Sequence, residues 1–183
     1  MIETERLRLR PWRPEDLDPF AAMSADPEVM RHFPELLARE EAAAHIAGLV
    51  AAAASDGFGF MPVEERARGA FLGMAGLKHV GFAAPFAPAV EIGWRLARDA
   101  WGKGYATEAA CAWLDYGLGA LGLAEIVAFT VPANRRSRAV MERLGMVRNA
   151  EDDFDHPCLP PGHPLRPHVL YRIGRDQRRS VTK

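Results

Sequence analysis

The stretch VEIGWRLARDAWGKGYATEA, residues 90–109, decides the fold of this chain. Its first seven residues alternate between apolar and polar side chains, which predicts a half-buried strand over 90–96. Gly102 and Gly104 follow in a turn, and the alanine-rich residues 106–121 predict a long helix. The apolar residues 125–131 predict the next strand. A strand–helix–strand unit of this kind is typical of a parallel crossover.

The rest of the chain predicts a mixed sheet. Further strands are expected over 6–10, 58–63, 70–79, 146–148 and 168–173, and further helices over 15–25, 35–54 and 134–144. Because several strands follow one another without a helix between them, part of the sheet should be antiparallel. We therefore predict a single α+β domain over residues 1–175, followed by a polar C-terminal tail over 176–183.

Composition narrows the class of protein. The chain has 183 residues and a formal net charge of −1, so it lacks the basic excess of a dedicated nucleic-acid binder. The N-terminus has neither the basic start nor the apolar run of a secretory signal, and no stretch is apolar enough to span a bilayer. Two cysteines suit a reducing compartment. We expect a cytoplasmic protein whose partners are neither nucleic acid nor membrane.

The glycine turn is a candidate phosphate site. Gly102 and Gly104 can adopt positive φ and let a ligand approach the backbone closely. The N–H groups at the start of the next helix lack partners, and with the helix dipole they attract anions, to which Lys103 adds a cation. The residues alone also allow a turn that only connects strand and helix, since the pattern matches neither a Walker loop nor a dinucleotide fingerprint.

Several motifs in order resemble the GNAT N-acetyltransferase superfamily. Residues 92–96 with 101–109 are similar to its acetyl-coenzyme A motif, and residues 131–137 with 144–146 to its second motif. The opening TERLRLR, residues 4–10, resembles the RimJ/RimL-type branch of ribosomal-protein N-terminal acetyltransferases. The resemblance implies the GNAT fold: a mostly antiparallel sheet of about seven strands, with a splayed parallel pair and about four helices. It also implies acetyl-CoA as co-substrate, attacked directly by an amine in a ternary complex.

The resemblance carries over to individual residues. It implies that the co-substrate is bound by Ile92, Gly93, Trp94, Trp101, Gly102, Lys103, Gly104, Tyr105, Ala106, Asn134 and Arg138. Asp99 departs from the family, which often has Gln or Arg there, and a carboxylate cannot donate a hydrogen bond to phosphate. Arg98 or Lys103 would substitute for it, or backbone amides alone would suffice.

Two residues are implied in catalysis. Ser137 would protonate the departing thiolate, and Glu91 would accept the proton of the amine through water. Each has another interpretation from the residues alone: Ser137 could satisfy a backbone amide, and Glu91 could be a surface carboxylate in a salt bridge. Asn134 could equally be a helix N-cap. His79 is a second candidate base.

The acceptor is left open between a protein N-terminus, an amino acid, a polyamine and an aminoglycoside-like compound. An α-amine with a pKa of about 7.8 is roughly one-third neutral at pH 7.5, whereas a lysine is only about 0.1% neutral, so a site without a clear base favours α-amines. The proline-rich loop 152–167 is expected to form one wall of the acceptor site, opposite His32 and Phe33, and no metal is expected. A non-catalytic acyl-CoA sensor and a homodimer remain open alternatives.

Overall fold

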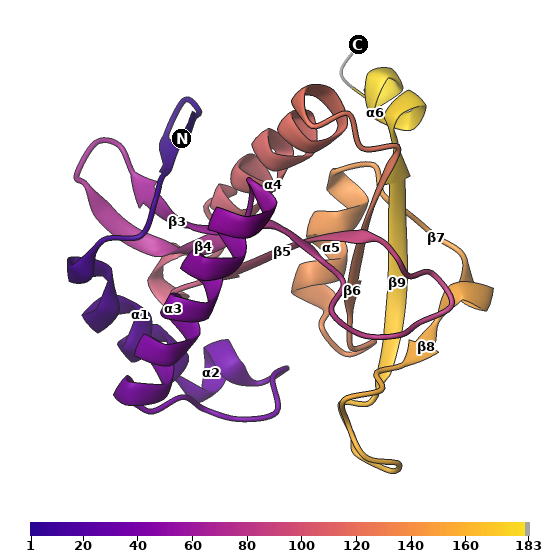
Figure 1. Cartoon of the computed structure of the whole chain (residues 1–183), viewed down its shortest axis with the longest axis horizontal. Coiled ribbons are helices and arrows are strands. Elements are labelled where there is room, and N and C mark those ends of the chain that lie inside the picture. Colours follow the sequence, from indigo (N-terminus) through magenta and orange to yellow (C-terminus); the bar gives the residue numbers. More distant parts are fainter. Residues whose placement is uncertain (182–183) are drawn as a thin grey trace. The chain divides into compact units, whose positions relative to one another are not determined.

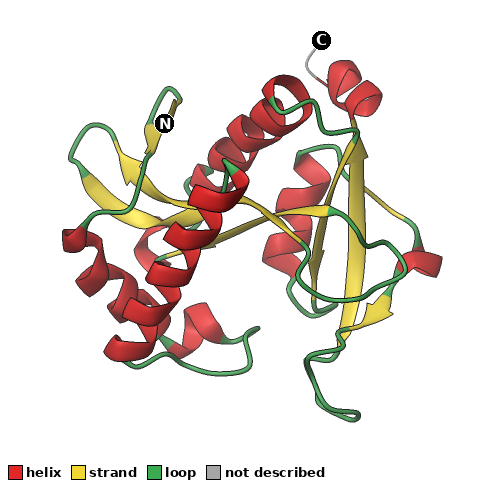
Figure 2. Ribbon diagram, in the orientation of Figure 1, coloured by secondary structure: helices red, strands yellow, loops and turns green. Residues whose placement is uncertain are grey.

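The computed structural model describes residues 1–181 (Figures 1 and 2). Its contacts fall into two compact units. The first comprises Met1–Lys78 and Gly93–Ala112, and the second comprises His79–Ile92 and the residues from Trp113 onward. The strand predicted over 90–96 therefore contributes residues to both units.

The first unit is built on an antiparallel sheet. Its strands β1 (Ile2–Glu3), β2 (Leu7–Leu9), β3 (Phe60–Glu65) and β4 (Ala70–His79) are neighbours in that order, and β5 (Val90–Leu96) is next to β4. The bounds of β4 and β5 are those expected from the sequence. β1 was not expected, because two residues are too few to show a period.

Helices pack on this sheet through one apolar cluster. They are α1 (Leu17–Ser24), α2 (Pro27–Met30) and α3 (Arg39–Asp56), while α4 (Tyr105–Asp115) follows the glycine turn. The buried members of the cluster are Phe20, Ala21, Met23, Val29, Met30, Ala42, Phe60 and Met74. Burying each large side chain of this kind stabilises the fold by about 1.5–3 kcal/mol, so the cluster is the main cause of helix docking.

The sequence predicted that helix α3 begins at Glu35, but in the structure it begins at Arg39. The reason is a cap: Glu41 Oε2 accepts a hydrogen bond from Ala38 N at 2.7 Å, which favours a start at that point. The helix ends at Asp56, two residues beyond the predicted end at 54, because Gly57 adopts a left-handed φ of 76° and closes it. The residues between α2 and α3 thus form a loop rather than a first helical turn.

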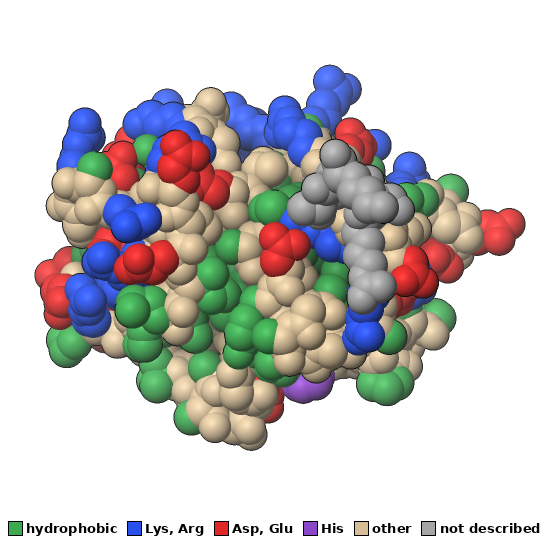
Figure 3. Space-filling model, turned by 90° about the horizontal axis from the view of Figure 1, so that it is seen from above, with side chains coloured by type: hydrophobic (Ala, Val, Ile, Leu, Met, Phe, Trp, Pro, Cys, Tyr) green, Lys and Arg blue, Asp and Glu red, His purple; other side chains and the backbone are tan. Residues whose placement is uncertain are grey.

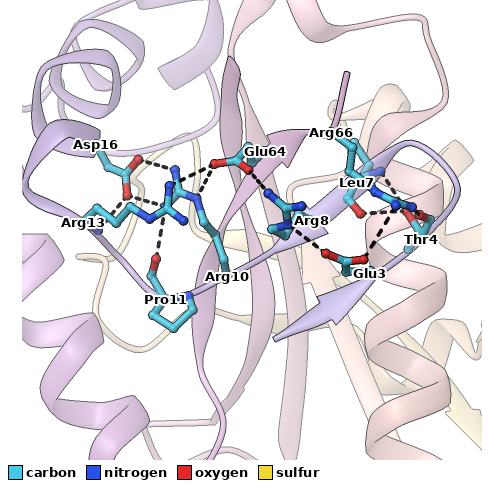
Figure 4. A network of polar contacts seen from close by, with 10 residues as sticks. All are labelled: Glu3, Thr4, Leu7, Arg8, Arg10, Pro11, Arg13, Asp16, Glu64 and Arg66. Atoms are coloured by element: carbon cyan, nitrogen blue, oxygen red, sulfur yellow. Dashed lines mark hydrogen bonds and ion pairs between the residues drawn. The ribbon is translucent and has the colours of Figure 1, made fainter. Parts of the chain in front are cut away.

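A buried ion network ties β2 to β3 and to the start of α1 (Figure 4). The guanidinium of Arg10 donates to both oxygens of Asp16 at 2.7 Å each and to Glu64 Oε2 at 2.5 Å. Glu64 also accepts from Arg8 at 2.9 Å. Burial opposes ionisation of Glu64, but the arginines outweigh it and hold its pKa below the ordinary value. Every charge in the network is therefore compensated.

The second unit contains the parallel pair. β6 (Glu125–Thr130) runs parallel to β5, with Glu91 opposite Val127. β9 (Pro167–Gly174) is antiparallel to β6, and the short strands β7 (Val147–Arg148) and β8 (Phe154–Asp155) both pair with β9. The helices of this unit are α5 (Arg135–Arg143) and α6 (Arg175–Val181).

The α+β fold with a mostly antiparallel sheet and one parallel pair is confirmed. Within residues 1–181 the sheet has nine strands rather than about seven, the added ones being the two-residue strands β1 and β8. Helix α6 occupies residues expected in a polar tail, and residues 182–183 of that tail lie outside the described part.

Acidic and basic side chains are interspersed on the face drawn in Figure 3. Through residue 181, no helix has the length and apolarity that crossing a bilayer requires.

Candidate active site

The glycine turn after β5 has the backbone that the sequence predicted. Gly102 and Gly104 have φ values of 75° and 82°, in the left-handed region. A Cβ on Gly102 would meet nothing within 4 Å, so backbone conformation rather than crowding requires the glycine there. Glu108 N donates to Gly104 O at 3.0 Å, and the N–H groups before it have no acceptor within the helix. Such N–H groups at a helix start form an anion site.

Aromatic side chains anchor both ends of this turn. Trp101 Nε1 donates to Leu96 O at 2.9 Å, and the Tyr105 hydroxyl donates to Glu65 at 2.7 Å. Tyr105 is buried, whereas Gly102, Lys103 and Gly104 are exposed. The exposed tip can therefore meet a ligand while its flanks are fixed to the sheet.

The N-terminal segment braces the turn, which the sequence analysis missed. Glu108 on α4 accepts from the Thr4 hydroxyl at 2.5 Å, from Arg6 N at 2.9 Å and from Arg6 Nε at 2.7 Å. Arg6 Nη1 in turn donates to Lys103 O at 2.9 Å, and its guanidinium lies 4.7 Å from the ring centre of Tyr105. Burial opposes ionisation of Glu108, but Thr4 and Arg6 lower its pKa overall. The brace therefore holds one carbonyl of the turn with an ionised pair.

Two of the predicted co-substrate residues on β5 belong to the first unit. A Cβ on Gly93 would lie 2.9 Å from Phe60 Cζ, so this glycine makes room for a core ring. Trp94 is half-buried. Asp99 lies exposed on the short 3₁₀ turn Arg98–Ala100. Contacts of Gly93 and Trp94 with a pantetheine arm stay a prediction.

The other two β5 residues of interest belong to the second unit. Ile92 is 3% exposed and Glu91 is 9% exposed, so Glu91 is buried and is not a surface carboxylate. His79, the second candidate base, is exposed at the end of β4. A buried carboxylate within the parallel pair suits proton relay better than an exposed imidazole, although the role of Glu91 stays a prediction.

Asn134 caps helix α5. Its Oδ1 accepts from Ser137 N at 3.2 Å, and its Nδ2 donates to the Thr130 hydroxyl at 2.9 Å, which links the end of β6 to the helix. The N-cap interpretation is thus confirmed. Among the described residues, none donates a hydrogen bond to the Ser137 hydroxyl and none accepts one from it. The group is available to a ligand rather than used in capping.

Arg138 is partly engaged by its own unit. Its Nε donates to the Tyr171 hydroxyl at 3.3 Å and its Nη1 to Pro132 O at 3.1 Å. The Tyr171 hydroxyl donates onward to Glu142 at 2.9 Å. Arg135, Arg138 and Glu142 line an open pocket of about 270 Å³ beside α5. The guanidinium groups could meet a phosphate there, and this role of Arg138 also stays a prediction.

Known proteins match this chain over most of its length, including the glycine turn and the α5 motif. The family model described as acetyltransferase (GNAT) domain matches residues 6–147. The chain belongs to the GNAT acetyltransferase family. An uncharacterized N-acetyltransferase, YnaD of Bacillus subtilis (strain 168), is 32% identical over 177 residues, which is 96% of this chain and 98% of YnaD.

Two further similarities support the GNAT assignment. The crystal structure of a GNAT-family acetyltransferase from Bacillus anthracis aligns with a TM-score of 0.80 at 28% identity, covering 96% of this chain and 98% of that one. A protein of Aspergillus fumigatus named FsC-acetyl coenzyme A-N(2)-transacetylase is 37% identical over 87 residues, which is 48% of this chain and 37% of that protein. The chain is therefore an acyltransferase of the GNAT type.

The residues of this GNAT chain fit acetyl-CoA. The family uses this thioester, whose pyrophosphate needs several N–H donors and an approach free of side chains. The turn supplies both, because its two left-handed glycines are exposed at its tip and the first N–H groups of α4, which follow them, have no acceptor within the helix. Lys103 adds a positive charge at the same place.

The proline-rich loop forms an aromatic cluster in the second unit. His156 lies 4.5 Å from the ring of Phe82, and His168 lies 5.9 Å from that of Phe129. Burial lowers the pKa of His168 and so disfavours its charged form. The loop's aspartates pair with arginines, namely Asp152 with Arg172, Asp153 with Arg148, and Asp155 with Arg166. Within residues 1–181, no three His, Cys, Asp or Glu side chains converge as metal ligands. His156 and His168 pack against these phenylalanine rings, and His163 Nδ1 accepts a hydrogen bond from Leu165 N at 3.1 Å.

Proposed function

We propose that this GNAT chain is an acetyl-CoA-dependent N-acetyltransferase that acetylates a primary amine in a ternary complex. The observation that carries the proposal is the turn at 102–104, which presents N–H donors at the start of α4 and is braced through Glu108. Residues 1–175 would act as one acetyltransferase domain. The family match over 6–147 supports this extent, because it includes residues of both units.

The chemistry assigns one role to each catalytic candidate. The amine nitrogen attacks the thioester carbonyl carbon, and its proton passes through water to the buried carboxylate of Glu91. The carbon–sulfur bond breaks as the sulfur takes the proton of the Ser137 hydroxyl, which is then replaced from water. The absence of any protein partner for that hydroxyl within residues 1–181 supports the second step.

The acceptor that we place first is an α-amine. The opening Thr4–Arg10, which resembles the RimJ/RimL branch, supports a protein N-terminus, and the ready deprotonation of a peptide α-amine supports acceptors whose amine has a low pKa. The opening has another task in the structure, because Thr4 and Arg6 brace the turn. Its sequence is therefore weak evidence for ribosomal proteins as such.

The test is release of free thiol from acetyl-CoA against peptides, amino acids, polyamines and aminoglycosides. We expect acceptor-dependent release, reduced about 10²-fold in Ser137→Ala with unchanged acetyl-CoA affinity. Ser55→Ala is the matched control, since Ser55 is exposed on α3. If Ser137→Ala is as fast as the wild type from pH 6 to 9, its role is wrong. Binding of acetyl-CoA without release by any amine would favour the non-catalytic sensor.

A further inference from the structure

Arg95 on β5 is a buried cation with two unused donors. Only 6% of the residue is exposed, and its single hydrogen bond runs from Nη1 to Met30 Sδ at 3.1 Å. Its Nε and Nη2 are buried and have no hydrogen-bond partner among the described residues. Burial lowers its pKa to about 10, so the group keeps its charge at neutral pH. Throughout residues 1–181, no carboxylate comes within 4.0 Å of it.

The same unit shows how this chain treats an arginine that serves structure. Arg10 is buried to a similar extent, with 3% exposed, yet Asp16 and Glu64 occupy its fork (Figure 4). Leaving a buried charge unpaired costs several kcal/mol, and buried donors without partners are rare in native proteins. An anion from outside the chain would pair with the Arg95 guanidinium in the way that the Asp16 carboxylate pairs with Arg10.

The unused donors have the geometry of a carboxylate site. Nε and Nη2 lie on one edge of the planar guanidinium, and two parallel N–H groups on such an edge match the two oxygens of a carboxylate. The guanidinium carbon lies 5.0 Å from the ring centre of Phe20 and 5.2 Å from that of Phe33. These flat apolar walls favour a planar anion over a tetrahedral phosphate.

The side chain of Phe33 is the place at which a ligand could reach Arg95 from solvent. It lies in the loop between α2 and α3 and is 40% exposed, whereas Phe20 is fully buried. The loop is held by hydrogen bonds from Phe33 N to Met30 O at 2.8 Å and from Leu37 N to Ser24 O at 3.0 Å. A rotation of the Phe33 side chain alone, with the loop backbone in place, would open the region of Arg95 to solvent.

We propose that Arg95 binds a carboxylate of the acceptor, so that the substrate is a small amine that also carries a carboxylate, such as an amino acid. The inference rests on the proposed acetyltransferase activity for the identity of the ligand as acceptor. Arg95 itself determines specificity and takes no part in the transfer of the acetyl group.

The first experiment compares amino acids with their amides as acceptors, at equal concentrations of neutral amine. We expect the wild type to prefer the carboxylates by about 10²-fold in kcat/KM, the size expected of a bidentate charged pair. In Arg95→Met the preference should fall to a few-fold, with kcat/KM for the amides little changed. Equal use of acids and amides by the wild type would overturn the inference and leave the acetyltransferase proposal standing.

The second experiment measures binding without acetyl-CoA, by the shift in unfolding temperature with added amino acid, amide or inorganic phosphate. If the carboxylates alone raise the unfolding temperature, and Arg95→Met abolishes that rise, the site is supported even when no amine is acetylated. In that case the missing acetylation counts against the proposed activity and not against the carboxylate site. Protection by phosphate but not by carboxylates would overturn the inference.

Stability distinguishes this role from a structural one. Arg95→Met removes an uncompensated buried charge, so the unliganded variant should unfold at the same temperature as the wild type or higher. Arg10→Met is the matched control. It leaves the buried carboxylates of Asp16 and Glu64 without the Arg10 cation, so this variant should unfold at a clearly lower temperature. If Arg95→Met loses as much as Arg10→Met, Arg95 is a structural residue and the inference fails.

Discussion

Replacing Glu108 by Gln should loosen the glycine turn from the N-terminal segment. Glutamine can keep the acceptor that Thr4 and Arg6 N use, but it places an NH₂ group opposite Arg6 Nε, where Oε2 now accepts at 2.7 Å. A hydrogen bond to a charged group contributes about 1.5–3 kcal/mol. Because Arg6 is 44% exposed, screening reduces this to about 1 kcal/mol. For a chain of this length, that lowers the unfolding temperature by about 2–4 °C.

The same change should weaken acetyl-CoA binding by more than its effect on stability suggests. Arg6, once freed from Glu108, no longer holds Lys103 O, and binding must then order the turn itself. Ordering one residue costs about 1–2 kcal/mol, which corresponds to a 5–30-fold rise in Kd. Calorimetric titration of acetyl-CoA measures this directly.

The control for Glu108→Gln is Asp18→Asn, which breaks an exposed pair with Arg39. An exposed pair contributes little, so this variant should match the wild type in both unfolding temperature and Kd. If Glu108→Gln unfolds earlier but binds acetyl-CoA with the wild-type Kd, the brace stabilises the fold without preparing the turn, and the reasoning is refuted.

Gly104→Ala and Gly69→Ala should each cost about 1–2 kcal/mol, because both glycines have a left-handed φ, yet only Gly104→Ala should abolish acetyl-CoA binding in titrations. Asn134→Ala should remove about 1 kcal/mol of stability with the α5 cap and weaken acetyl-CoA severalfold; wild-type values of both would contradict the proposed dual role. The lowered pKa of Glu64 stabilises the fold above about pH 4.5 and this gain is lost as pH falls further, so the difference in urea unfolding between wild type and Glu64→Gln should shrink from pH 7 to about pH 3.5.

The local features of the site could be predicted from the sequence because they depend on neighbours in the chain. The left-handed Gly102 and Gly104 and the cap by Asn134 follow from residue type and position in a turn, and all three are present. The bounds of β5 follow from alternation over seven residues. The family match agrees with the order of these motifs.

What could not be predicted depends on contacts between distant residues. The sequence shows Thr4 and Glu108 as a polar residue near the N-terminus and an acid in a helix, and only the fold brings them together. Arg95 is a similar case, since it occupies a polar position of an alternating strand, where an exposed side chain is expected. Its burial arises from Phe20 and Phe33 on other elements. His156 and His168 are polar residues in the sequence, but the fold packs their rings against Phe82 and Phe129.

The contact between Thr4 and Glu108 also bears on the order in which the chain can assemble. The two residues are separated by 104 positions, and closing so long a loop is slow compared with forming α4 or the β3–β4 pair. A nascent chain exposes its opening segment long before Glu108 has been synthesised. The strand–turn–helix segment can therefore form early, but its glycine turn gains its brace only when the two ends of the first unit meet. A fragment that carries the acetyl-CoA motif alone would lack this constraint, so its glycine turn should be less ordered than the same turn in the whole first unit.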